Sequence, residues 1–143
     1  MSLVSQSITV VVEVPRWSFV KRGASGEREF VSPVPCPFNY GSVRGVAGHD
    51  GDLQDAVVLG PRLRAGTQVQ TSVWMVVQFQ DEGAVDNKWI CSTAPPTRME
   101  EIGVVVFFRI YARCKWAMNF LCGRRGTTSY LGVTKPRFDP PMG

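Results

Sequence analysis

Residues 69–79 read VQTSVWMVVQF, and this stretch decides what kind of fold the chain can form. β-Branched and aromatic side chains dominate it, and such residues favour strands. Glutamine, threonine and serine are interspersed, as on a strand with one face toward a core and the other toward solvent. The stretch therefore predicts a long strand of a barrel or an antiparallel meander.

Shorter stretches on both sides carry the same kind of signal. Each is rich in β-branched or aromatic residues, and the first of them ends at Pro15, which cannot continue a central strand. Further strands are therefore predicted at 8–14, 55–59 and 88–91.

Two connecting regions are predicted between these strands. Alternating apolar and polar residues at 17–21 lead into a glycine-rich hairpin turn at 23–26, after which another strand begins near Arg28. Prolines and glycines break up residues 32–51, so this stretch is predicted to be a long loop bearing Asn39-Tyr40-Gly41. Loops of that length in a compact domain are usually functional or disordered.

One helix is predicted in the second half of the chain. Thr97 followed by Glu100 is a capping box, which predicts a helix over 98–113. Four apolar residues recur at helical spacing within it and are predicted to pack in the core: Met99, Ile102, Val106 and Ile110. Because residues 104–108 are β-branched and aromatic, a strand remains an alternative there.

Length and composition limit the class of protein. The 143 residues correspond to one domain, with a core at about 8–122 and an irregular basic tail at 123–143. Four scattered cysteines and one histidine show no zinc-ligand spacing, so free thiols and a reducing intracellular compartment, cytoplasmic or mitochondrial, are expected. No stretch is apolar enough to span a membrane.

The acidic residues are unevenly distributed. Six of the twelve lie in two short clusters, one formed by Asp50, Asp52 and Asp55 and the other by Asp81, Glu82 and Asp86. Without these six, the net charge of +4 would be +10. Clustered carboxylates stay ionised together most easily around a cation, and carboxylate oxygens suit Mg²⁺ or Ca²⁺. The pattern therefore predicts a metal site in a protein that attracts polyanions.

The positions of the two clusters sharpen this hypothesis. The first cluster leads into a predicted strand and the second follows one, so both can lie at one end of a barrel and hold a pair of Mg²⁺ ions. Water shared by two such ions is acidified enough to become hydroxide near neutral pH. A carboxylate that is not fully used as a ligand can accept its proton.

Several motifs in register resemble the soluble family I inorganic pyrophosphatases. They are Glu13-Val14-Pro15-Arg16-Trp17-Ser18, Lys21, Arg28, Asn39-Tyr40-Gly41, Asp50-Gly51-Asp52 with Asp55, and Asp81-Glu82-Gly83 with Asp86 and Lys88. The resemblance covers residues 8–93 well and continues weakly to 107–111. The first motif resembles the eukaryotic branch, although this chain is shortened and divergent.

The resemblance implies an enzyme that hydrolyses pyrophosphate to two phosphates with Mg²⁺, through a metal-bridged water. It also implies an OB-like five-stranded barrel with one or two flanking helices, in the mainly β or α+β class. The implied general base is Asp52. The implied substrate-binding residues are Lys21, Arg28, Tyr40, Lys88 and Tyr111, and the implied metal ligands are Asp50, Asp55, Asp81, Asp86 and Glu13.

The chain departs from the family at three positions of the expected site. Gly23, Cys36 and Ala112 stand where the family has glutamate, tyrosine and lysine. These changes, with the basic composition, favour an alternative in which a weakly active or inactive barrel is a subunit of a larger, mitochondrial assembly. A homo-oligomer is the other predicted state. A third reading is RNA binding, with contacts from the basic tail residues Arg124, Arg125, Lys135 and Arg137.

Overall fold

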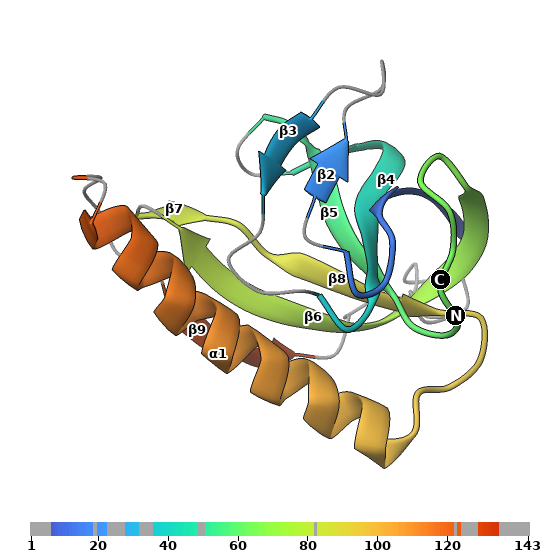
Figure 1. The fold of residues 1–143 in the computed structure, drawn as a ribbon. Coiled ribbons are helices and arrows are strands. Elements are labelled where there is room, and N and C mark those ends of the chain that lie inside the picture. Colours follow the sequence, from blue (N-terminus) through green and yellow to red (C-terminus); the bar gives the residue numbers. More distant parts are fainter. Residues whose placement is uncertain are drawn as a thin grey trace, which may run out of the picture.

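The computed structural model describes residues 7–18, 20–22, 28–31, 36–48, 51–81, 83–121, 123 and 129–134. Five of its strands form a closed barrel (Figure 1): β1 (Ile8–Val14), β4 (Asn39–Ala47), β5 (Leu53–Val58), β8 (Lys88–Ser92) and β6 (Gln68–Asp81). β6 returns to pair with β1 and so closes the ring. The β5–β8 pair is parallel and the other pairs are antiparallel. This arrangement confirms the predicted OB-like barrel.

The remaining elements surround the barrel. β2 (Val20–Arg22) and β3 (Arg28–Val31) form the predicted hairpin, whose turn lies outside the described residues. β7 (Ala84–Val85) and β9 (Ser129–Thr134) both pair with the second half of β6. The prediction of an irregular tail is therefore wrong for β9, whereas residues 135–143 lie outside the described part of the chain.

The predicted loop at 32–51 is wrong for its central part, because residues 39–47 form β4. This strand pairs with β1 on one side and β5 on the other. A Cβ atom at Gly41 would overlap the carbonyl oxygen of Val11, so only glycine lets the two backbones approach so closely. The two glycines of β4 make its sequence resemble a loop, and only strand pairing reveals their role.

Asn39 fixes the start of β4. The residue is fully buried, and its side-chain oxygen accepts hydrogen bonds from the backbone N–H groups of Arg16 and Leu63 at 3.1 and 2.8 Å. Its side-chain nitrogen donates to the carbonyl oxygens of Val58 and Pro61. A buried amide with all these partners is stable in the core, and it joins three segments next to the barrel.

The helix α1 (Arg98–Leu121) begins as predicted. Thr97 Oγ1 accepts from the N–H of Glu100 at 3.1 Å, and Glu100 Oε1 accepts from the N–H of Thr97 at 2.9 Å, which is the reciprocal capping box. This helix excludes the alternative strand at 104–108. It is also longer than the predicted 98–113, because no proline or glycine occurs between residues 113 and 121.

The predicted core face of α1 is wrong. The side of the helix that packs on the barrel carries Val104, Phe108 and Ala112, which are buried. The four residues predicted to be core are all exposed: Met99, Ile102, Val106 and Ile110. Apolar residues occur on nearly every side of this helix, so its periodicity could not identify the buried side.

The hydrophobic core has two parts. One contains residues from all five barrel strands, among them Val10, Val43 and Val73, and fills the barrel. The other lies between α1 and strands β5, β6 and β8, and includes Phe79 and Phe108. Successive strand residues point to opposite faces. Asp55 lies two residues before Val57 in β5, and Lys88 lies two residues before Ile90 in β8. Both therefore lie on the face that is turned toward α1.

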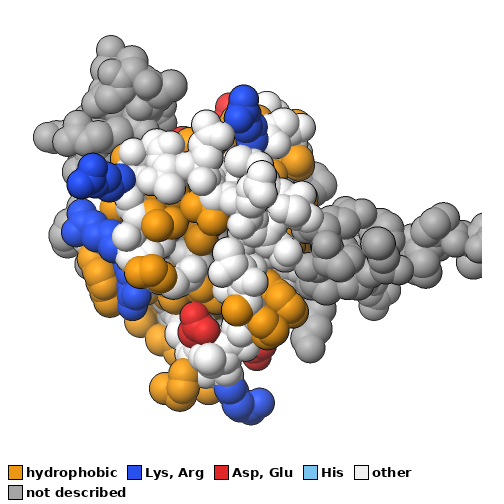
Figure 2. All heavy atoms as spheres, turned by 90° about the vertical axis from the view of Figure 1, so that its right-hand side faces the viewer, with side chains coloured by type: hydrophobic (Ala, Val, Ile, Leu, Met, Phe, Trp, Pro, Cys, Tyr) orange, Lys and Arg blue, Asp and Glu red, His pale blue; other side chains and the backbone are white. Residues whose placement is uncertain are grey.

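Figure 2 shows the face that lies on the right of Figure 1, where hydrophobic side chains reach the surface between polar ones. Lysine and arginine side chains lie at the rim of this face, with several of them on the left side of Figure 2. Among the described helical residues, none form a segment long and apolar enough to cross a membrane.

Candidate active site

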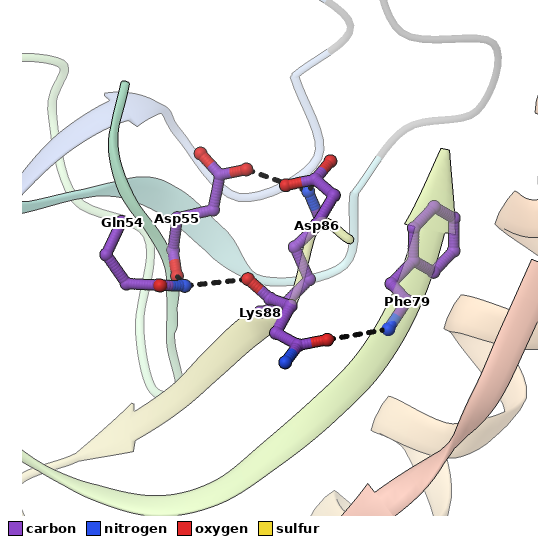
Figure 3. Close-up of polar contacts among 6 residues, drawn as sticks. Gln54, Asp55, Phe79, Asp86 and Lys88 are labelled. Carbon is purple, nitrogen blue, oxygen red and sulfur yellow. Dashed lines mark hydrogen bonds and ion pairs between the residues drawn. The ribbon is translucent and has the colours of Figure 1, made fainter. Parts of the chain in front are cut away.

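Lys88 joins the two acidic clusters. Its Nζ atom lies 2.8 Å from Asp55 Oδ2 and 2.7 Å from Asp86 Oδ2, and Figure 3 shows both carboxylates turned toward the ammonium group. Asp55 comes from the first cluster and Asp86 from the second. The predicted convergence of the two clusters is therefore observed for one carboxylate of each.

Strand pairing produces this arrangement. The parallel pairing of Ala56 with Trp89 places the preceding residues, Asp55 and Lys88, side by side. Asp86 lies in the short segment between β7 and β8, and its side chain extends toward Asp55 and Lys88 (Figure 3). The three charged groups are thus positioned by backbone pairing, which limits the entropy lost when they order.

Two amides hold the segment that carries Asp86. Gln54 Nε2 donates to the carbonyl oxygen of Asn87 at 2.7 Å, and Asn87 Oδ1 accepts from the N–H of Phe79 at 3.2 Å (Figure 3). Gln54 is buried, so its amide is protected from competing water. The sequence prediction missed both residues, although the position of Asn87 between two site residues could have indicated it.

Aromatic residues surround the ammonium group. Lys88 Nζ lies 5.6 Å from the centres of the Tyr40 and Phe79 rings, a distance at which cation–π attraction operates. Tyr111 of α1 packs against Phe79 and, together with Tyr40 and Lys88, lines a cavity of about 40 Å³. The predicted residues Tyr40, Lys88 and Tyr111 therefore share one site with Asp55 and Asp86.

Burial and charge shift the pKa values of these groups in different directions. Burial alone would raise the pKa of Asp55, but the charge and hydrogen bond of Lys88 outweigh it and hold that pKa below its ordinary value. Burial, together with the charge of Asp55, raises the pKa of Asp86. When the carboxylate pair takes up a proton, Asp86 is therefore the residue that accepts it first.

The two other titratable groups keep their protons. Burial would lower the pKa of Lys88, but the charges of Asp55 and Asp86 raise it above the ordinary value, so the side chain stays an ammonium ion. Burial and then the negative charge of Asp55 raise the pKa of Tyr40 well above its usual range. Both groups are hydrogen-bond donors at neutral pH.

The donor set fits a hard divalent cation in part. Asp55 and Asp86 present carboxylate oxygens that already share one positive charge, and such oxygens are the ligands that Mg²⁺ prefers. Within the described residues, no three acidic, histidine or cysteine side chains come together as a metal cluster. A complete site would need the other predicted ligands, which are Glu13 of β1 and two residues whose side chains fall outside that part, Asp50 and Asp81.

The other predicted site residues are placed as follows. Asp52 is exposed in the turn before β5, and Glu13 lies in β1 between the buried Val12 and Val14. Lys21, Arg28 and Asp81 belong to strands β2, β3 and β6, but their side chains are outside the description. Asp50 lies outside the described residues. The roles predicted for these residues stay predictions.

Two of the three departures from the family pattern lie in described positions. Cys36 is buried at the cavity next to Tyr40, and burial raises the pKa of its thiol to about 12, so it is not a nucleophile. Ala112 is buried against the barrel. Arg109 and Arg113 line a groove between α1 and β9, and Ala112 lies between them in the same groove.

Fold and site together define a closed β-barrel whose two acidic turns meet at a buried lysine beside a helix. Residues 10–114 match the family model of inorganic pyrophosphatase. Since this match covers most of the chain, the protein belongs to the inorganic pyrophosphatase family. The family resemblance drawn from the sequence motifs is thereby confirmed.

Individual relatives agree with this assignment. The chain is 34% identical over 92 residues to an inorganic pyrophosphatase of Gluconobacter oxydans, covering 59% of this chain and 53% of the relative. A Helicobacter pylori inorganic pyrophosphatase is 32% identical over 94 residues, covering 60% of this chain and 54% of the relative. The chain thus spans about half the length of the curated relatives it matches.

Solved structures resemble the fold over more of the chain. The inorganic pyrophosphatase of Thermus thermophilus superposes with a TM-score of 0.73 at 25% identity, covering 92% of this chain and 83% of that one. The enzyme of Neisseria gonorrhoeae gives 0.72 at 21% identity, covering 92% and 84%. At 21% identity the likeness shows the fold alone.

Proposed function

We propose that this chain hydrolyses inorganic pyrophosphate to two phosphates with the help of Mg²⁺. The observation that carries the proposal is the meeting of Asp55 and Asp86, one from each acidic turn, at the ammonium group of Lys88. Such a group combines oxygen ligands for a hard cation with a fixed positive charge for a phosphate. Membership of the inorganic pyrophosphatase family supports the same reaction.

The proposed cation ligands are Asp50, Asp55, Asp81 and Asp86, with Glu13 near outer cations. Bound Mg²⁺ would neutralise phosphate oxygens and acidify a water held between the cations. Asp52 is the proposed acceptor of that water's proton, and its exposed position in the turn before β5 leaves it accessible to solvent. Asp55 remains ionised because its pKa is held low, which suits a ligand.

The cationic and phenolic residues have a different proposed role. Lys88, kept as an ammonium ion, donates to phosphate oxygens and balances the charge that develops on the departing phosphate. Tyr40 keeps its proton and donates to a phosphate oxygen. Lys21, Arg28 and Tyr111 complete the proposed substrate site. Because pyrophosphate carries several negative charges, these donors also orient it for attack.

The departures from the family pattern predict slower turnover. A charge-assisted hydrogen bond contributes roughly 1.5–3 kcal/mol, so loss of a transition-state contact at Ala112 would slow the reaction about ten- to hundredfold. Cys36 offers a thiol, a weak donor, in place of a phenol. The enzyme is therefore expected to be active but weaker than relatives that keep both groups.

A phosphate-release assay with pyrophosphate and Mg²⁺ tests the proposal. Asp52→Asn should lower kcat by roughly 10²–10⁴-fold because the general base is lost. Asp55→Asn should lower it by a similar factor and weaken the Mg²⁺ dependence. Glu101→Gln, an acid in the first turn of α1, is the matched control and should stay within about twofold.

The assay also separates the proposal from its alternative. Unchanged turnover in both aspartate variants would contradict the assigned site. A wild-type chain that folds, as judged by circular dichroism, but releases no phosphate would contradict hydrolysis. That result would favour a barrel serving as a subunit of a homo-oligomer or a larger assembly. Salt-sensitive RNA binding without turnover would favour the third reading.

A further inference from the structure

The backbone ladder between β5 and β8 stops short of the charged group. Their parallel pairing begins at Ala56 and Trp89. Asp55 and Lys88 lie one residue before this ladder, and Asp86 lies two residues before Lys88, in the segment between β7 and β8. Pairing of the two strands therefore does not by itself fix the Asp86 carboxylate relative to the Asp55 carboxylate.

The side chain of Gln54 supplies a link beyond the end of the ladder. Its Nε2 atom donates to the carbonyl oxygen of Asn87 at 2.7 Å (Figure 3) and to that of Asp55 at 3.1 Å. Asn87 stands between Asp86 and Lys88 in the chain. One buried amide thus joins the backbone of β5 to the backbone that carries the other two charged side chains.

The segment that carries Asp86 is held to β6 by other bonds. The N–H of Asp86 donates to the carbonyl oxygen of Phe79 at 2.9 Å, and the N–H of Phe79 donates to Asn87 Oδ1 at 3.2 Å. Since β8 lies between β5 and β6 in the sheet, these bonds and the Gln54 amide act from opposite sides. Removing the amide therefore loosens the segment on the side of Asp55.

Gln54 acts from the face of β5 opposite to the carboxylates. It lies two residues before Ala56, which packs inside the barrel, whereas Asp55 lies on the face turned toward α1. The amide therefore does not occupy the carboxylate oxygens of Asp55 or Asp86. It can hold these two side chains in place without competing with a cation for them.

We propose that Gln54 is a positioning residue for Mg²⁺, which sets the separation of the Asp55 and Asp86 carboxylates. This inference rests on the proposed function, since it concerns the same cation. Both carboxylates reach one nitrogen atom of Lys88, at 2.8 and 2.7 Å, so the chain holds them close enough to share a cation. Ligands that are ordered before binding lose less conformational entropy on binding. The Gln54 amide therefore strengthens Mg²⁺ binding and leaves the chemical step unchanged.

Calorimetric titration of the full chain with Mg²⁺, without substrate, tests the role of Gln54. Gln54→Met keeps the length of the side chain but removes both hydrogen bonds, and it should weaken Mg²⁺ binding about three- to tenfold. At saturating Mg²⁺, kcat should return to within about twofold of the wild type. Val73→Ala, which truncates a buried residue inside the barrel, is the matched control and should keep the wild-type affinity. Unchanged affinity in Gln54→Met, or a kcat that stays low at saturating Mg²⁺, would overturn the inference.

A double mutant tests whether Gln54 acts through Asp86. Asp86→Asn removes the carboxylate that Gln54 positions, so adding Gln54→Met should then weaken Mg²⁺ binding by less than about twofold. The same loss in both backgrounds would overturn the inference. Gln54→Asn, an amide one methylene shorter, gives the same comparison where Gln54→Met fails to fold.

Hydrogen exchange separates this inference from the proposed function, because it needs neither Mg²⁺ nor substrate. The backbone amides of residues 85–88 should exchange at least about threefold faster in Gln54→Met, whereas those of β1 and β4 should keep their rates. Unchanged exchange at 85–88 would overturn the role of Gln54 even in an active enzyme. A wild type that binds no Mg²⁺ would overturn both proposals. A wild type that releases no phosphate, with the expected loss of Mg²⁺ affinity in Gln54→Met, would contradict hydrolysis and support the role of Gln54.

Discussion

The two sides of helix α1 differ in what covers them, although both are apolar. The inner side packs Val104, Phe108 and Ala112 on the barrel, and Tyr111 beside them lines the candidate site. The outer side presents an equally apolar stripe to solvent. Hydrophobicity therefore did not determine which side is buried. The inner side is buried because its side chains fit the surface formed by β5, β6 and β8.

The inner side of α1 also lies next to the candidate site. Lys88 and Asp55 lie on barrel strands, and α1 packs aromatic side chains such as Phe107 and Phe108 against the same side of the barrel. Changes on the inner side should therefore disturb both stability and the site. Changes at the exposed residues of the outer side should affect both much less.

The largest expected effect comes from truncating the inner side. Phe108→Ala should lower the free energy of unfolding by about 3–5 kcal/mol, because it removes a buried ring and leaves a cavity. Ile110→Ala, at an exposed position on the outer side, should change the free energy of unfolding by less than about 1 kcal/mol. Urea denaturation followed by fluorescence measures both. Equal losses would contradict the assignment of the two sides.

A slightly smaller effect is expected from the charged group under the helix. Lys88→Met leaves two partly buried carboxylates without their cation and should cost about 3 kcal/mol without metal. Added Mg²⁺ should recover part of this loss if the carboxylates bind it. Thermal unfolding in chelator and in Mg²⁺ measures the difference, with Arg64→Met, at an exposed position, as the control. Failure of Mg²⁺ to stabilise either protein would argue against a cation site.

The smallest expected effect is a gain in stability, whereas the two changes above lower it. Asp86 has a raised pKa in the folded state, so its contribution to stability is present below its unfolded pKa and is lost as the pH rises through the folded value. Asp86→Asn should therefore be more stable than the wild type without metal at pH 7. The difference should shrink toward pH 4. A less stable variant at pH 7 would show that the Lys88 contact dominates.

Local sequence identified most of the strands and the capped start of the helix. Runs such as 8–14 and 69–79 consist of residues whose shape favours strands, and the capping box is defined by two residues three positions apart. The same reasoning failed for β4, where Gly41 is needed by a neighbouring strand. It also ended α1 too early and missed β9.

The candidate site was predictable to a similar degree. Charge clustering indicated Asp55 and Asp86, and the family resemblance added Lys88, Tyr40 and Tyr111, which the fold brings together. Gln54 and Asn87 were missed because each acts through one long-range hydrogen bond. Such bonds leave no periodic signal in the sequence.

The sequence by itself determined four of the five barrel strands, the acidic turns and the family, since each depends on residue type and spacing along the chain. Only the tertiary structure decided which side of α1 is buried and which carboxylates share the ammonium group of Lys88. Those outcomes depend on strand register and on shape fit between distant segments. Side chains far apart in sequence become neighbours only when the barrel closes.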